Sequence, residues 1–162
     1  MADVSMKYIK VAEVISKSST CLRRQYGAVI VKDDEIVSTG YNGAPRKEPN
    51  CTDLKYCLRE VKHIPHGERY ELCRSVHAEM NAIISAGRKL CIGSDLYLYG
   101  YDLNDQASIV PTPYMMCRRF IVQAGIKRII TLNDVEIDLE LVPLSSMIEW
   151  IKRYKKSIMR II

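Results

Sequence analysis

Two short motifs constrain this chain more than any other feature of its sequence. Each stands where a helix is predicted to begin: His-Ala-Glu at 77–79 and Pro-Tyr-Met-Met-Cys at 113–117. The His77 ring and the Cys117 thiolate are metal-binding groups, and the Glu79 carboxylate lies in the favourable field of a helix N-terminus. Alone, the first motif is better explained as a surface His and Glu at a helix start; its surroundings favour a site. A fold that joins the two helix starts would build one site from both motifs.

The hydrophobic pattern predicts strands alternating with helices. Apolar residues at 6, 9, 11, 14 and 15 indicate an opening helix. Strands at 27–31 and 35–40, joined by a Lys-Asp-Asp turn, form a hairpin. The elements predicted after it are a helix at 76–86, a strand at 95–100, a helix at 115–124 and a strand at 127–132. This order is typical of a layered domain, and we expect a three-layer α/β/α fold with a central mixed sheet, in one domain over 1–162.

The last thirty residues carry no recognisable motif. An apolar stripe predicts a closing helix; its members are Leu144, Met147, Ile148, Ile151, Tyr154 and Ile158. The opposite face of that helix carries Lys152, Arg153, Lys155 and Lys156. We interpret this basic face as solvated, with contact to nucleic acid as the less favoured alternative.

Composition narrows the function classes. The chain has 162 residues and a net charge of +5, a mild excess that suits an anionic small molecule as well as a polynucleotide. Its first twenty residues do not read as a signal peptide, and no apolar run approaches membrane-spanning length. We therefore expect a cytoplasmic protein whose six cysteines are reduced and available for metal binding or catalysis.

The motifs resemble those of the zinc-dependent cytidine and deoxycytidylate deaminases, whose signature is H-x-E followed by P-C-x-x-C. The resemblance runs over about residues 7–132 and is strongest toward the deoxycytidylate deaminases. Four blocks carry it: Arg-Arg-Gln-Tyr-Gly-Ala-Val-Ile-Val from 23, Gly-Tyr-Asn-Gly-Ala-Pro-Arg from 40, Cys-Arg-Ser-Val-His-Ala-Glu-Met-Asn-Ala-Ile from 73 and Cys-Arg-Arg-Phe-Ile-Val-Gln-Ala-Gly-Ile from 117. The chain departs from the signature at Tyr114, where the family has its first cysteine.

The resemblance implies roles for individual residues. In the family one imidazole and two thiolates hold zinc, which makes His77 and Cys117 two ligands and Glu79 the group that moves protons. The Ala78 amide would contact the amino group of cytosine, and Asn42 would contact deoxyribose. Two further residues, Arg24 and Arg46, are candidates for the phosphate, because a guanidinium can grip it with two hydrogen bonds; solvated surface is the alternative for each.

Tyr114 leaves three interpretations open. A phenol oxygen lies farther from the backbone than a cysteine sulfur, and tyrosine ionises near pH 10, against about 8.5 for cysteine. Zinc can persist with a tyrosinate or another third ligand. The site can instead be free of metal and silent while still binding nucleotide. The glutamate and its pocket can also serve altered chemistry.

Four other cysteines bracket the irregular stretch at 42–74. Some deoxycytidylate deaminases hold a second, structural zinc with cysteines at places like Cys21 and Cys51. We expect Cys57 and Cys73 to complete a closed four-thiolate site, with His63 or His66 as spare ligands. Buried free thiols are the alternative, and Cys91 is interpreted as an ordinary core residue.

Two functions therefore compete. One is hydrolytic deamination of dCMP to dUMP in pyrimidine nucleotide metabolism; the other is a nucleotide-binding protein on the same scaffold, favoured by Tyr114. A tRNA or DNA deaminase is a third alternative, less favoured because the Tyr-Asn-Gly-Ala-Pro block resembles the mononucleotide enzymes more. By resemblance we also expect a homo-oligomer with dCTP and dTTP as effectors, and no membrane partner.

Overall fold

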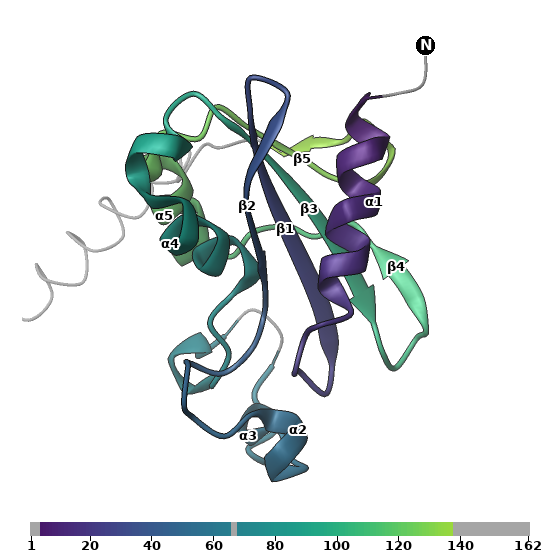
Figure 1. Ribbon diagram of the computed structural model, residues 1–162. Helices are drawn as coiled ribbons and strands as arrows, with labels where there is room; N and C mark the ends of the chain where they lie inside the picture. The colour runs from purple at the N-terminus through teal and green to yellow at the C-terminus, as the bar shows by residue number, and fades with distance from the viewer. Residues whose placement is uncertain (1–3, 66–67, 138–162) are drawn as a thin grey trace, which may run out of the picture.

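A hairpin near the N-terminus starts the sheet on which the other elements are built (Figure 1). The structure is a computed structural model that describes residues 4–65 and 68–137. Its helices are α1 (Val4–Ser16), α2 (Cys51–Leu54), α3 (Leu58–Val61), α4 (Ala78–Cys91) and α5 (Met115–Ala124), with 3-10 turns η1 (Tyr70–Leu72) and η2 (Leu132–Asp134). Its strands are β1 (Arg24–Lys32), β2 (Glu35–Tyr41), β3 (Asp95–Asp102), β4 (Ala107–Ile109), β5 (Arg128–Ile130) and β6 (Glu136–Ile137).

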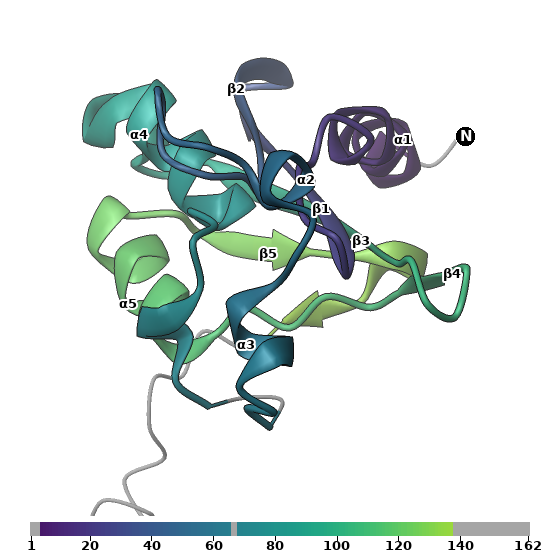
Figure 2. The same ribbon diagram turned by 90° about the horizontal axis from the view of Figure 1, so that it is seen from below.

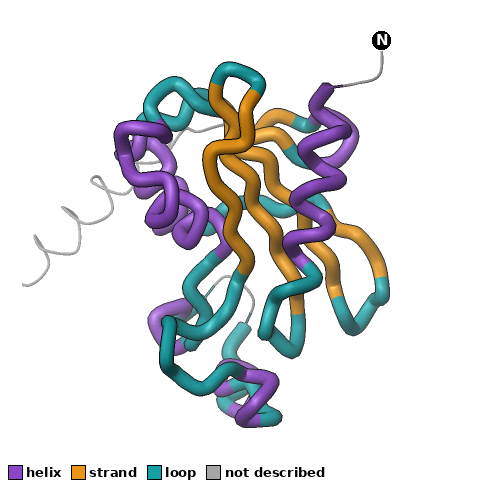
Figure 3. The backbone as a smooth tube through the Cα atoms, viewed as in Figure 1, coloured by secondary structure: helices purple, strands orange, loops and turns teal. Residues whose placement is uncertain are grey.

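The strands form one mixed sheet (Figure 3). The order is β2-β1-β3-β5-β6, and β4 pairs with β3. The pair β3–β5 is parallel and every other pair is antiparallel, which confirms the predicted mixed sheet. The sequence reading missed β4 and β6, because strands of three and two residues are too short for a period to register.

Helices cover both faces of the sheet (Figure 2). Successive residues of a strand point to opposite faces, so Ala28 and Ile30 enter one buried cluster while Val29 and Val31 enter the other. The clusters are completed by Ala82, Cys117 and Ile121 of α4 and α5 on one face and by Tyr8, Ile9 and Ala12 of α1 on the other. The three-layer α/β/α fold is therefore confirmed.

The predicted opening helix is confirmed, but its buried side matches the expected apolar stripe only in part: Ile9 is in the core and Val11 packs against it. Val14 is 63% exposed, whereas Tyr8, Ile9 and Ala12 are buried. The Tyr8 ring lies 5.0 Å from that of Tyr97, and its hydroxyl donates a hydrogen bond to the Asp34 carbonyl oxygen (2.7 Å). The polar end of an amphipathic tyrosine thus finds a partner inside the fold, and this contact orients the helix.

The long segment between β2 and α4 is ordered by polar contacts. The Thr20 hydroxyl donates to the Asn50 side chain (2.9 Å), and Asn50 caps α2 through a capping box. Farther on, Arg59 donates to the carbonyl oxygens of Pro65 and Glu68, both at 2.8 Å. These contacts hold the segment beside the starts of β1 and α4.

One predicted element is shorter than expected, and another lies outside the described residues. The strand predicted at 127–132 is shorter, because η2 follows β5 directly and Asn133 adopts a left-handed conformation with φ 60°. The predicted closing helix lies outside the described residues, so a single domain over 1–162 stays a prediction. No helix within 4–65 and 68–137 has the length and apolar character needed to cross a bilayer.

We predict that Gly27→Ala destabilises the protein strongly. A Cβ at this position would lie 1.9 Å from the Ala12 carbonyl oxygen, in the backbone of α1, so the helix must move away from β1. The expected loss is about 1–3 kcal/mol of unfolding free energy, measured by urea denaturation. Val14→Ala, on the exposed side of the same helix, should change stability by less than about 0.5 kcal/mol. Equal effects of the two changes would contradict the packing described.

We also predict a pH-dependent contribution from Asp102. Arg24 and Asp102 are cross-strand partners of β1 and β3, and the Arg24 Nε donates to the carboxylate at 2.8 Å. This hydrogen bond holds the pKa of Asp102 below its usual value. A depressed pKa contributes stability above the unfolded value of about 3.9, and that contribution is lost as pH falls through the folded pKa.

Asp102→Asn should therefore lower stability by about 1 kcal/mol near pH 7, and the difference from the wild type should shrink below about pH 4. Urea denaturation at both pH values measures this. Asp105→Asn, at an exposed position in the following turn, is the control and should behave as wild type at both. A difference between wild type and Asp102→Asn that is independent of pH would rule out the ion pair as its cause.

Candidate active site

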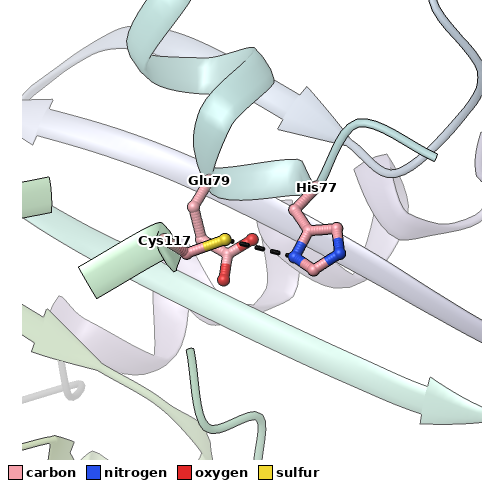
Figure 4. Close-up of side chains that lie close together, drawn as sticks. All are labelled: His77, Glu79 and Cys117. Atoms are coloured by element: carbon pink, nitrogen blue, oxygen red, sulfur yellow. Dashed lines mark hydrogen bonds between the residues drawn. The ribbon is translucent and has the colours of Figure 1, made fainter. Parts of the chain in front are cut away.

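The two predicted motifs meet in space at the starts of α4 and α5 (Figure 4). His77 is the N-cap residue of α4, Glu79 lies in the first turn of that helix, and Cys117 lies in the first turn of α5. The His77 Nδ1 is 3.1 Å from the Cys117 sulfur. One ligand atom from each of the three side chains lies within 4.8 Å of the other two. The structure therefore brings together the imidazole, the carboxylate and the thiol that the sequence singled out.

A close approach between α4 and β2 positions the first of these helix starts. A Cβ on Gly40 would lie 2.3 Å from the Ala78 carbonyl oxygen, so only glycine allows this contact. The Ser38 hydroxyl donates to the Ala82 carbonyl oxygen, and the Asn81 side chain donates to that of Tyr41, both at 2.8 Å. The first turn of α4 is thus fixed against β2, and His77 and Glu79 are fixed with it.

Burial sets the charge of the three groups. It raises the pKa of the Glu79 carboxyl and, together with the nearby Glu79, raises the pKa of the Cys117 thiol strongly. Burial lowers the pKa of His77, but a hydrogen bond with Cys73 and the charge of Glu79 raise it, and the net shift is upward. Both acids are therefore harder to ionise here than in water. A cation bound between them would reverse this, because metal binding displaces the thiol proton.

The residues present fit a zinc ion. Zinc in proteins is held by imidazole nitrogen, thiolate sulfur and carboxylate oxygen, and one of each lies in this cluster. Helix N-termini surround it, which favours the ionised thiolate. A family zinc centre would draw one nitrogen and one sulfur from His77 and Cys117 and would need a further ligand at position 114.

Tyr114 occupies that position as the N-cap residue of α5. Its ring lies against that of Tyr70, with centroids 4.4 Å apart and planes inclined at 41°. Within the described part of the chain, no hydrogen bond joins its hydroxyl to His77, Glu79 or Cys117. The residue that replaces the expected cysteine is therefore engaged through its ring.

A cavity of about 170 Å³ opens beside the cluster. Among the predicted site residues, its walls include His77, Glu79, Tyr114, Asn42 and Arg24. The Asn42 side chain accepts from the Tyr26 N–H (2.8 Å) and donates to the Arg24 carbonyl oxygen (2.9 Å), so it also holds the cavity edge to β1.

Two of the residues predicted to contact the nucleotide do not line the cavity. Arg46 is exposed and is not among the described residues that line the cavity, and the buried Ala78 is not among them either. The roles given to Arg46, Ala78, Asn42 and Arg24 stay predictions.

Two residues of the cavity were missed by the sequence analysis. Arg59 and Tyr70 both line it, and the Arg59 guanidinium lies 4.2 Å from the Tyr70 ring centroid. Arg59 is only 4% exposed. Their segment has no regular period, so nothing local distinguishes this arginine from the exposed ones around it.

Three of the four predicted structural cysteines line the same cavity. Cys21, Cys57 and Cys73 line it, and Cys51 is buried at the start of α2. Burial raises the pKa of Cys51, and the other three thiols raise it further, so all four are near one another. No three of these sulfurs lie within 4.8 Å of each other in the part of the chain described.

The other cysteines and histidines named from the sequence lie in different surroundings. All six cysteines are free thiols, and Cys91 is a buried core residue as expected. His63 is exposed, and His66 lies outside the described residues. Burial raises the pKa of Cys73, but its hydrogen bond with His77 and bonds to Ser75 lower it, and the net shift is downward. Cys73 and His77 also line the same cavity.

Comparisons with known proteins agree with this geometry. The family model described as the cytidine and deoxycytidylate deaminase zinc-binding region matches residues 3–133. A deoxycytidylate deaminase of Mycobacterium phage D29 is 31% identical over 128 residues, which are 76% of this chain and 89% of the relative. The deoxycytidylate deaminase of Schizosaccharomyces pombe is 30% identical over 131 residues, 81% of this chain but 37% of the relative. The chain thus spans little more than a third of that yeast protein.

A solved structure supports the same assignment. The dCMP deaminase from cyanophage S-TIM5, crystallised in complex with dCMP and dUMP, superposes with a TM-score of 0.56 and 25% identity. The match covers 81% of this chain and 82% of the phage protein. With its two motifs meeting in one cavity and the family model covering most of its length, the chain belongs to the cytidine and deoxycytidylate deaminase family, whose domain is zinc-binding.

Proposed function

We propose that this chain catalyses the hydrolytic deamination of dCMP to dUMP. The observation that carries the proposal is the meeting of His77, Glu79 and Cys117 beside one cavity. Two relatives that are 30% and 31% identical to this chain are deoxycytidylate deaminases. The S-TIM5 enzyme was crystallised with dCMP and dUMP. The products are dUMP and ammonia, with one water consumed.

The chemistry needs a group that both accepts and returns a proton. Zinc held by His77 and Cys117 would supply a Lewis acid that makes water more acidic. The Glu79 carboxylate takes a proton from the water that adds to C4 and delivers it to the ring nitrogen N3. It then assists the departure of the amino group as ammonia, so the water oxygen remains on C4. Burial raises the pKa of Glu79, which suits a residue that must hold a proton between these steps.

The rest of the cavity suits an anionic nucleotide. Arg24 and Arg59 line it, and Arg24 is the better placed of the two predicted phosphate ligands, since Arg46 is exposed and outside the cavity lining. Asn42 lies between Arg24 and Tyr26, a position compatible with a sugar contact. The cavity of about 170 Å³ is open to solvent on one side, so a mononucleotide can enter it.

A second candidate is a nucleotide-binding protein without deaminase activity. The observation that favours it is Tyr114, which stands where the family has a zinc ligand and which packs its ring on Tyr70. This alternative predicts binding of dCMP with no release of ammonia, so the same assay separates the two functions.

We expect Glu79→Gln to abolish deamination while leaving dUMP binding within about threefold of the wild type. The amide keeps the size of the side chain but cannot accept the water proton, and a lost general acid–base group costs about 10²–10⁴ in rate. Ammonia release measures the first effect, and calorimetric binding of dUMP, which does not turn over, compares nucleotide binding by the two proteins. Glu35→Gln, at the exposed first residue of β2, is the control. Binding without ammonia release in the wild type would instead support the second candidate.

We also propose a structural zinc held by Cys21, Cys51, Cys57 and Cys73. Its support is that three of the thiols line one cavity and that all three raise the pKa of the fourth, Cys51. The sulfurs are farther apart than in a formed site, and a bound ion would draw them together. A closed four-thiolate site would hold the segment from 42 to 74 to the start of β1.

Cys57→Ser should remove about one zinc per chain and lower the melting temperature, since metal-binding free energy is coupled to folding. Metal analysis and thermal unfolding on the same samples measure both. Cys91→Ser makes the same chemical change in the core and should lower stability without changing zinc content. Unchanged zinc in Cys57→Ser would exclude this residue as a ligand.

We further propose a cytoplasmic homo-oligomer. Large apolar side chains are exposed on neighbouring helices: Ile84 of α4 at 74% and Phe120 of α5 at 48%. A surface that pairs copies of the chain would bury them. Control by dCTP and dTTP stays a prediction of the family resemblance.

A further inference from the structure

Three rings meet at the point where the chain departs from its family. The Tyr70 ring contacts that of Tyr114 at 4.4 Å and meets the His77 ring edge-on at 5.6 Å, with planes at 83°. All three residues line the cavity. The wall next to the catalytic imidazole is therefore aromatic, and Tyr114 is part of it.

A buried cation holds this wall in place. The Arg59 guanidinium lies 4.2 Å from the Tyr70 ring centroid, a distance at which cation and ring attract each other. One terminal nitrogen of Arg59 donates to two carbonyl oxygens, of Pro65 and Glu68. Its Nε is buried and has no hydrogen-bond partner among the described residues. Arg59 is thus fixed by its neighbours, and it fixes Tyr70 in turn.

We propose that Tyr114 forms, with Tyr70, the surface on which the pyrimidine ring of the nucleotide packs. This inference rests on the proposed function and adds a contact residue to it. The two rings adjoin His77, beside which the reacting C4 must lie, so a bound base lies within their reach. Packing of a base on an aromatic side chain is worth about 1–3 kcal/mol. Position 114 has therefore exchanged a metal ligand for a base contact.

The competing role for Tyr114 is as a zinc ligand through its phenol oxygen. The two roles use different parts of the side chain: base packing needs the ring, and coordination needs the hydroxyl. Tyr114→Phe removes only the hydroxyl, and Tyr114→Leu keeps much of the volume but removes the aromatic face. These two substitutions therefore separate the roles.

The experiment measures dUMP binding by calorimetry on zinc-loaded protein, together with zinc per chain. The product dUMP is used because it does not turn over. Tyr114→Phe should retain zinc and bind dUMP within about twofold of wild type, whereas Tyr114→Leu and Tyr114→Ala should bind about 5- to 100-fold more weakly. Tyr114→Cys should raise zinc per chain and the turnover of saturating dCMP, yet weaken dUMP binding as alanine does.

Tyr56→Ala is the matched control. Tyr56 is 48% exposed and is not among the cavity-lining residues, so its loss should leave dUMP binding unchanged. Melting temperatures establish that each variant is folded. If Tyr114→Ala does not fold, Tyr114→Leu alone tests the loss of the aromatic ring. Unchanged dUMP binding in Tyr114→Leu would overturn the base contact alone. Loss of zinc in Tyr114→Phe would identify the Tyr114 hydroxyl as a zinc ligand, and this result would also overturn the base contact.

Nucleotide binding by the wild type distinguishes failure of the base contact from failure of the proposed function. If the unaltered protein binds neither dUMP nor dCMP, the proposed function fails and the base contact fails with it. If the wild type binds dUMP and the Tyr114 variants bind it equally well, the proposed function stands and the base contact does not.

Discussion

The close packing of α4 against β2 at Gly40 is the contact on which the site depends. A side chain at Gly40 would lie 2.3 Å from the Ala78 carbonyl oxygen, so the first turn of α4 reaches the sheet only because none is there. Hydrogen bonds from Ser38 and Asn81 then hold the helix at that distance. Since His77 and Glu79 belong to this turn, their placement follows from how closely a helix and a strand can pack.

The cluster that results is shaped for a cation. An acid and a thiol are buried beside an imidazole, and burial raises the pKa of both Glu79 and Cys117. Burial therefore makes both groups harder to ionise than they are in water. In the proposed function a bound zinc would take the Cys117 thiolate as a ligand, and the Glu79 carboxyl would carry protons. The same burial therefore serves metal binding and proton transfer, as expected of a zinc-binding deaminase domain.

The segment between β2 and α4 joins the two proposed metal sites. It supplies the cysteines Cys51, Cys57 and Cys73 together with Arg59 and Tyr70, and Cys73 interacts with the His77 ring. Both Cys73 and His77 line the cavity, so the cysteine group and the candidate zinc ligand His77 face the same space. Tyr114 contacts the same segment through Tyr70, so the residue that departs from the family pattern depends on it too.

The sequence by itself determined the longer helices and strands and the residues that could bind a metal. The hairpin, the two helix starts and the His77, Glu79 and Cys117 donors could all be read from local period and motif, because those signals lie within one element. Only the tertiary structure decided which face of α1 is buried, that Arg59 lines the cavity while Arg46 does not, and that Tyr114 packs on Tyr70. Each of these depends on contacts between residues far apart in the chain, which local patterns do not encode.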